Sequence, residues 1–147
     1  AVLPANWRDF RDVLAIERIC FPGDAWPWID VLAALAFPDT VRLKAIREER
    51  LVGFVIGDRR RLEKTGWIAS IAVHPESRRQ GVGRLLLEHC EQELGLPRVR
   101  LTLRRSNLGA LKLYRLSGYS EIGVWERYYR DGEDALLMEK VMDARAG

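Results

Sequence analysis

Apolar residues recur along the chain with two different periods, and each period predicts a different kind of element. Spacings of three and four residues predict amphipathic helices at residues 7–19 and 28–37. The second helix should stop at Pro38, because proline lacks the amide that another helical turn would need. The same spacing predicts two later helices, and alternating or continuous apolar runs predict strands. The remaining elements expected in this way are helices at 81–94 and 108–116, and strands at 41–47, 51–57, 67–73, 99–104, 119–129 and 135–141.

The order of these elements indicates the fold class. Two helices come first, a strand meander follows, and the chain then runs strand, helix, strand, helix, strand, strand. That order predicts a mixed α/β domain built on one sheet. The chain has 147 residues, with no internal repeat or low-complexity linker to divide it. We therefore expect residues 1–147 to form a single domain.

Composition excludes several classes of function. The net charge of +3 is too small to indicate a nucleic-acid surface. No apolar run approaches the roughly 20 residues that cross a bilayer, so we expect a soluble protein without a membrane partner. Cys20 and Cys90 lie beside apolar neighbours and are expected as reduced thiols in the cytoplasm. His74 and His89 lack partners at metal-ligand spacing, so no metal is expected. The oligomeric state is not predicted.

A glycine-rich turn joins the apolar strand at 67–73 to the helix that follows it. Gly81 and Gly83 allow the backbone to approach a ligand closely, and the first amides of the helix point outward at the positive end of its dipole. Such a junction binds phosphate. Leu86 stands where the dinucleotide-binding fingerprint needs a third glycine, so that motif is excluded. The alternative is an ordinary turn whose arginines serve solubility.

This turn resembles the pyrophosphate loop of the GCN5-related N-acetyltransferase (GNAT) superfamily. The matching residues are Arg78-x-x-Gly81-x-Gly83, after a Val-x-Pro strand end at 73–75, and the resemblance extends over nearly the whole chain. It implies a central mixed, mostly antiparallel sheet with helices on both faces, and acetyl-coenzyme A as co-substrate. The pantetheine is implied to follow the strand, and the pyrophosphate to meet the loop amides. The implied cofactor-binding residues are Ile71, Ala72, Val73, Arg78, Arg79, Gln80, Gly81, Val82, Gly83, Arg84, Asn107 and Tyr114.

A second stretch, Ser106-Asn107-x-x-Ala110-x-x-Leu113-Tyr114, matches the asparagine box of the same superfamily. The resemblance implies that Asn107 contacts the cofactor and that Tyr114 protonates the leaving coenzyme A thiolate. Spacing alone also allows Tyr114 to be a core aromatic side chain.

The end of the chain resembles the closing hairpin of protein N-terminal acetyltransferases, among them the bacterial ribosomal-protein-alanine N-acetyltransferases. The similarity lies in residues 127–135, and it implies that Tyr128 and Tyr129 grip the first residues of the acceptor. Residues 17–27 likewise resemble the acceptor-side loop of that family. The alternative is an ordinary hairpin in which paired aromatic residues stabilise the sheet.

One position departs from the family pattern. The relatives carry a glutamate as general base on the strand before the asparagine box, and Thr102 stands there in this chain. A threonine cannot take up a proton near pH 7, so Glu17 and Glu126 are the alternative candidates for the base. We expect transfer of acetyl from acetyl-coenzyme A to a primary amine, and the expected amine is a protein N-terminus such as that of a ribosomal protein. The alternatives are acetylation of a small amine, a non-catalytic acetyl-coenzyme A sensor and a basic binding module.

Overall fold

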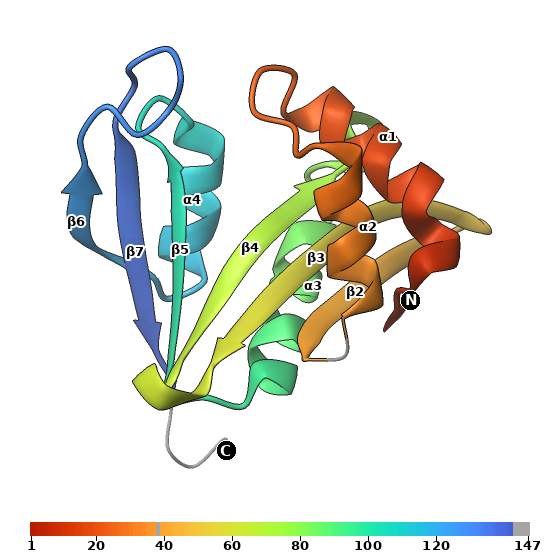
Figure 1. Ribbon diagram of the computed structural model, residues 1–147, viewed down its shortest axis with the longest axis horizontal. Helices are drawn as coiled ribbons and strands as arrows, with labels where there is room; N and C mark the ends of the chain where they lie inside the picture. Colours follow the sequence, from red (N-terminus) through yellow and green to blue (C-terminus); the bar gives the residue numbers. More distant parts are fainter. Residues whose placement is uncertain (38, 143–147) are drawn as a thin grey trace.

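Seven strands form one sheet in the computed structural model, which describes residues 1–37 and 39–142 (Figure 1). The strand order is β1-β2-β3-β4-β5-β7-β6, and every neighbouring pair is antiparallel except β4 and β5. The expected mixed, mostly antiparallel sheet is therefore confirmed. The strands are β1 (Val2–Pro4), β2 (Thr40–Arg47), β3 (Arg50–Arg60), β4 (Thr65–Val73), β5 (Arg98–Arg104), β6 (Ser120–Trp125) and β7 (Ala135–Val141).

Helices lie on both faces of this sheet, as expected. On one face, α1 (Phe10–Cys20) and α2 (Trp28–Ala36) pack against β2, β3 and β4. On the other face lie α3 (Val82–Leu94) and α4 (Leu108–Leu116), the latter behind β5 and β7 (Figure 1). Pro38, where the second helix was expected to stop, lies outside the described residues. No helix within the described part of the chain is long and apolar enough to cross a membrane.

The strands differ from the expectation in two places. The edge strand β1 was not expected, because three residues are too few for an alternating pattern to be recognised. The strand expected at 119–129 ends at Trp125, and residues 126–134 form the connection to β7. In that connection, Arg127 has a left-handed backbone with a φ of 51°, which a strand cannot accommodate. This connection, here called the β6–β7 loop, borders the site described below.

Two hydrophobic cores fix the helices to the sheet. Leu86 and Leu87 of α3 are fully buried on one face, where each contributes about 2 kcal/mol by the area that it removes from water. Val13 of α1 and Phe54 of β3 are buried on the other face. Because Val55 belongs to the first core and its neighbour Phe54 to the second, β3 is apolar on both faces, as a central strand is. The two cores therefore fix the helices to both faces of the sheet.

The strands β4 and β5 separate soon after they meet. They are paired only where Thr65–Trp67 lie beside Arg98–Arg100, and beyond these residues they diverge (Figure 1). In the pairing of β4 with β3, Ile56 lies opposite Ser70, and the next residue, Gly57, lies opposite Ile68. Ala69, between Ile68 and Ser70, therefore has no partner on β3 and forms a bulge in β4. A bulge bends the strand that carries it, and this one bends β4 away from β5. The remaining length of β4 therefore has a free hydrogen-bonding edge.

Candidate active site

The turn between β4 and α3 has the backbone geometry of an anion-binding loop. Gly81 has a φ of 79° and Arg79 a φ of 64°, and Gly81 directly precedes α3. Because the helix begins at Val82, its first amides have no partner within the helix and point outward at the positive end of its dipole. A pyrophosphate is the kind of group that such amides bind.

The two glycines of this turn serve different purposes. A Cβ on Gly81 would meet no atom within 4 Å, but its left-handed backbone disfavours any other residue. Gly83 does not have a left-handed backbone, and a Cβ there would make ordinary contacts with Leu113 Cδ2 at 3.4 Å and Val73 Cγ2 at 3.6 Å. Conformation therefore requires glycine at Gly81, whereas the protein itself has room for an alanine at Gly83.

The end of β4 presents backbone groups to the gap between the strands. The amide of His74 donates to the carbonyl of Val52, on the β3 side, at 2.7 Å. Because successive peptide groups of a strand point to opposite edges, the amides of Ile71 and Val73 point toward the free edge. The side chain of Ala72 is buried in the core beneath α1. The residues implied to bind the pantetheine therefore offer main-chain donors.

The arginines of the loop are less directly available than the resemblance implies. Arg78 Nε donates to the carbonyl of Val73 at 3.2 Å, and Arg78 Nη2 lies 3.3 Å from Cys20 Sγ, so this side chain fastens α1 to the end of β4. Arg84 Nε forms an exposed pair with Glu88 at 3.1 Å. Arg79 and Gln80 are exposed. The guanidinium groups of Arg78 and Arg84 are therefore engaged within the protein, whereas that of the exposed Arg79 can meet an anion beside the loop amides.

The asparagine box brings a cap and a buried phenol toward the gap. Asn107 Oδ1 accepts the amide of Ala110 at 3.2 Å and so caps α4. Tyr114 is 7% exposed and packs edge to face against Tyr119, with ring centroids 5.9 Å apart. Burial, and then the neighbouring Tyr129, raise the pKa of the Tyr114 hydroxyl above its ordinary value. Tyr114 is therefore a protonated donor at neutral pH.

Thr102, the position to which the resemblance assigns the general base, lies beside Tyr129. The neighbouring Thr102 side chain lowers the pKa of the Tyr129 hydroxyl. Burial and the charge of Asp24 outweigh that effect and raise the pKa of Tyr129 to about 12. The ring of Tyr129 also lies 4.3 Å beneath the guanidinium carbon of Arg104. The hydroxyls of Thr102, Tyr114 and Tyr129 thus lie in one region, around the position where Thr102 stands in place of the relatives' glutamate.

The two carboxylates suggested as alternative bases have different surroundings. Glu17 is 2% exposed, and its oxygens accept from the Trp26 amide at 3.3 Å and the Ser70 hydroxyl at 3.0 Å. Burial raises the pKa of Glu17. Both oxygens are engaged, so these contacts favour a role in holding the loop between α1 and α2. Glu126 is exposed and forms no hydrogen bond with another described residue.

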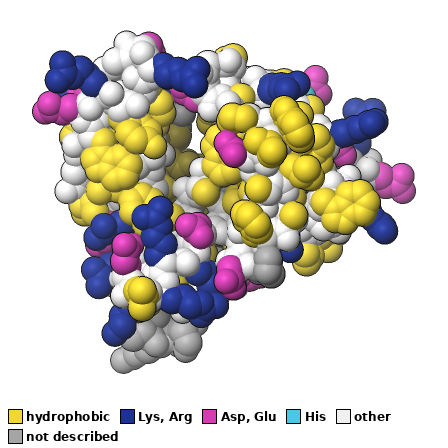
Figure 2. Space-filling model, in the orientation of Figure 1, with side chains coloured by type: hydrophobic (Ala, Val, Ile, Leu, Met, Phe, Trp, Pro, Cys, Tyr) yellow, Lys and Arg dark blue, Asp and Glu magenta, His cyan; other side chains and the backbone are white. Residues whose placement is uncertain are grey.

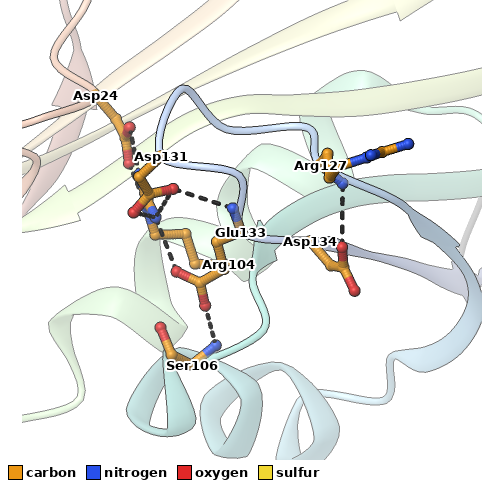
Figure 3. Close-up of polar contacts among 7 residues, drawn as sticks. All are labelled: Asp24, Arg104, Ser106, Arg127, Asp131, Glu133 and Asp134. Carbon is orange, nitrogen blue, oxygen red and sulfur yellow. Dashed lines mark hydrogen bonds and ion pairs between the residues drawn. The ribbon is translucent and has the colours of Figure 1, made fainter.

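Sequence reasoning missed Arg104, the residue with the densest set of polar contacts at the gap. Its guanidinium binds Asp24 from the loop between α1 and α2, and Asp131 and Glu133 from the β6–β7 loop (Figure 3). The alternation of β5 could have placed Arg104 on the same face as Thr102. Its main partner Asp24 lies 80 residues away, and no local pattern connects the two.

Aromatic side chains continue the site along the front of the sheet. The rings of Trp67, Trp125, Tyr128 and Tyr129 form a connected row, with successive centroids 6.1, 5.3 and 5.1 Å apart. Figure 2 shows the surface hollowed between this aromatic half and the half that carries α1 and α2. Tyr128 and Trp125 are partly exposed. The row is therefore accessible from solvent at Trp125 and Tyr128.

Comparisons with known proteins agree with this geometry. A ribosomal-protein-alanine N-acetyltransferase of Salmonella typhimurium is 36% identical over 143 residues, which cover 92% of this chain and 88% of that protein. An N-alpha-acetyltransferase of Sulfurisphaera tokodaii is 29% identical over 148 residues, covering 91% of this chain and 88% of that protein.

Solved structures and the family profile point the same way. The crystal structure of a ribosomal-protein-alanine N-acetyltransferase from Escherichia coli matches with a TM-score of 0.84 at 26% identity, covering 97% of this chain and 94% of that one. The profile of the acetyltransferase (GNAT) family matches residues 7–119, which is more than half of the chain. The resemblance carried by the glycine-rich loop and the asparagine box is thereby confirmed, and the chain belongs to the acetyltransferase (GNAT) family.

Proposed function

We propose that this protein transfers the acetyl group of acetyl-coenzyme A to the α-amine of a protein N-terminus. One observation carries the proposal: the gap between β4 and β5 has an anion-binding loop at the end of β4 and a cluster of neutral hydroxyls on the opposite side. The relatives named above, which act on α-amines by their names, support the same choice of acceptor.

Main-chain groups of β4 and α3 would bind acetyl-coenzyme A, the acetyl donor. The pyrophosphate would lie on the amides that open α3, and the pantetheine would run along the free edge of β4 as an added strand does. The Val73 amide points toward this edge and would donate to the thioester carbonyl oxygen. That hydrogen bond strengthens as the oxygen gains negative charge in the transition state, which lowers the barrier.

Proton movement must follow the bonds that form and break. The neutral amine attacks the carbonyl carbon, the carbon–sulfur bond breaks, and the amine nitrogen loses a proton. We assign Tyr114 as the group that supplies a proton to the sulfur. Its raised pKa keeps the hydroxyl protonated at neutral pH, so that a proton is present to transfer as the carbon–sulfur bond breaks.

The hydroxyl cluster favours an acceptor that needs little help in losing its proton. An α-amine has a pKa of about 7.7–8.0 and a lysine side chain about 10.4, so at pH 7.4 about a quarter of N-termini but about one lysine in a thousand are neutral. A site with Thr102 in place of a glutamate therefore acts best on α-amines. The hydroxyls of Thr102 and Tyr129 would hold a water molecule, and the proton that leaves the amine would pass through that water to the solvent.

A peptide panel tests the proposal. The panel contains a peptide with a small first residue and an internal lysine, the same peptide with a blocked N-terminus, and a set of small amines. We expect turnover of acetyl-coenzyme A with the first peptide alone, with the added acetyl group on its α-amine by mass spectrometry. Turnover with small amines alone would reassign the acceptor, and binding without turnover of any amine would make the protein a sensor.

The free thiols of Cys20 and Cys90 suit the reducing cytoplasm, where we propose that the protein acts.

A further inference from the structure

We propose that Arg104 is a positioning residue that clamps the loop between α1 and α2 to the β6–β7 loop and thereby shapes the acceptor end of the site. The inference rests on the proposed function, since it concerns the binding of the same acceptor. Arg104 is the last residue of β5, at the point where the gap between β4 and β5 is open.

The Arg104 guanidinium binds carboxylates of both loops. Arg104 Nε and Nη2 donate to the two carboxylate oxygens of Asp24 at 2.6 and 2.8 Å. Arg104 Nη1 donates to Asp131 at 2.8 Å and to Glu133 at 2.8 Å (Figure 3). A planar guanidinium can serve several carboxylates in this way, and the bidentate pair fixes direction as well as distance. Arg104 therefore joins two segments that face each other across the gap.

The two sides of the clamp differ in how else they are held. The β6–β7 loop has further anchors, because Glu133 accepts the Ser106 amide at 2.7 Å (Figure 3) and the carbonyl of Asp134 accepts the Arg105 amide at 3.1 Å. On the other side, the pair between Asp24 and Arg104 is the only hydrogen-bonded link, within the described ranges, between residues 1–37 and 98–142. Loss of this pair would free the loop between α1 and α2 from the C-terminal half while leaving the β6–β7 loop in place.

The clamp also fixes the side chain that borders the reaction centre. The Arg104 guanidinium lies over the ring of Tyr129, and Tyr129 meets Thr102 beneath it. Three carboxylates surround a single guanidinium, so the cluster keeps excess negative charge. Asp131 is the most open of them, with 62% of its side chain exposed. An acceptor that carries positive charge is therefore attracted to this cluster, in which Arg104 holds the two loops together.

A matched pair of variants tests the clamp. Asp24→Asn removes the charge that holds the loop, whereas Asp30→Asn removes a charge from the exposed first turn of α2, where Asp30 has no hydrogen-bonded side-chain partner among the described residues. We expect Asp24→Asn to raise the KM for the acceptor peptide about tenfold, in line with the loss of one charged hydrogen-bonded pair. The Kd for acetyl-coenzyme A should stay within twofold of wild type. Hydrogen exchange should become faster at residues 21–27, and Asp24→Glu should restore both properties in part.

Each outcome decides the matter. A rise in KM together with faster exchange, both confined to Asp24→Asn, supports the clamp. Faster exchange without a change in KM would mean that the loop is tied but does not position the acceptor, and a change in KM without faster exchange would mean that Asp24 touches the acceptor directly; either result overturns the proposal. If the wild-type protein acetylates no peptide α-amine, the proposed function fails. In that case unchanged exchange in Asp24→Asn would independently overturn the clamp.

Discussion

Replacement of Gly81 by alanine probes the loop that we assign to the pyrophosphate. The new Cβ would meet nothing within 4 Å, so the change adds no clash inside the protein. Its cost comes from the backbone, because the φ of 79° is a left-handed conformation that disfavours residues with a Cβ by about 1–2 kcal/mol. The neighbouring Arg79 already holds a left-handed conformation, so the turn has little freedom to share the strain.

The backbone strain in Gly81→Ala appears either in the Kd for coenzyme A or in the free energy of unfolding, depending on whether the empty loop can relax. If the alanine variant relaxes when the site is empty, binding must restore the left-handed turn, and the Kd for coenzyme A rises about five- to thirtyfold. If the turn keeps its shape, the same 1–2 kcal/mol, approximately, is lost from the free energy of unfolding instead. Calorimetric titration with coenzyme A and denaturant unfolding together measure both quantities.

Gly83→Ala is the matched control. It lies two residues further on, has an ordinary backbone, and gains only van der Waals contacts with Leu113 and Val73. Alanine also favours a helix over glycine by up to about 1 kcal/mol, so stability should be equal or higher. No loss of either affinity or stability in Gly81→Ala would refute the reasoning. A larger loss of affinity in Gly83→Ala than in Gly81→Ala would instead place the pyrophosphate against Gly83.

Three further substitutions test the chemistry and the core. Tyr114→Phe should lower kcat about 10²–10⁴-fold in a coenzyme A release assay while leaving the Kd for acetyl-coenzyme A unchanged, and an unchanged kcat would return Tyr114 to the core. Thr102→Glu should add a general base and move the pH profile of kcat/KM toward lower pH; a profile that stays in place would show that position 102 does not reach the amine. Tyr119→Phe removes a hydroxyl that donates to the buried Glu91 at 2.6 Å and should cost about 2 kcal/mol in urea unfolding, with the Kd for acetyl-coenzyme A as the control.

The parts of the site that sequence could predict are those encoded by local patterns. The loop around Gly81 was expected because glycine spacing and the junction of a strand with a helix define such a turn within a few residues. The resemblance singled out Thr102 and Tyr129 separately, and the structure shows that the two side chains are neighbours. The end of β6 was misplaced because the aromatic pattern continues past Trp125, while the left-handed backbone at Arg127 leaves no trace in hydrophobicity.

The parts that sequence could not predict depend on contacts between distant residues. Arg104 lies on a simple alternating strand, and nothing near it in sequence reveals that its main partner is Asp24. Glu17 was considered as a base, although it shares the helical stripe of Val13 and Ile16, which is the buried face of α1. That spacing is the signal that could have indicated a structural carboxylate. A charged residue on an apolar stripe requires polar partners, and these come from Trp26 and Ser70.

The claim that the acceptor's own α-amine, rather than a carboxylate of the enzyme, sets the protonation requirement can be tested by one measurement. The pH dependence of kcat/KM is recorded for two peptides of the same sequence length and charge whose α-amine pKa values differ by about one unit, a difference within the range that these groups show. Because only the neutral amine attacks, kcat/KM should rise with pH along each amine's titration, and the two profiles should be displaced by the difference in pKa. Coincident profiles would contradict the account, since they would mean that a group of the enzyme titrates as the general base.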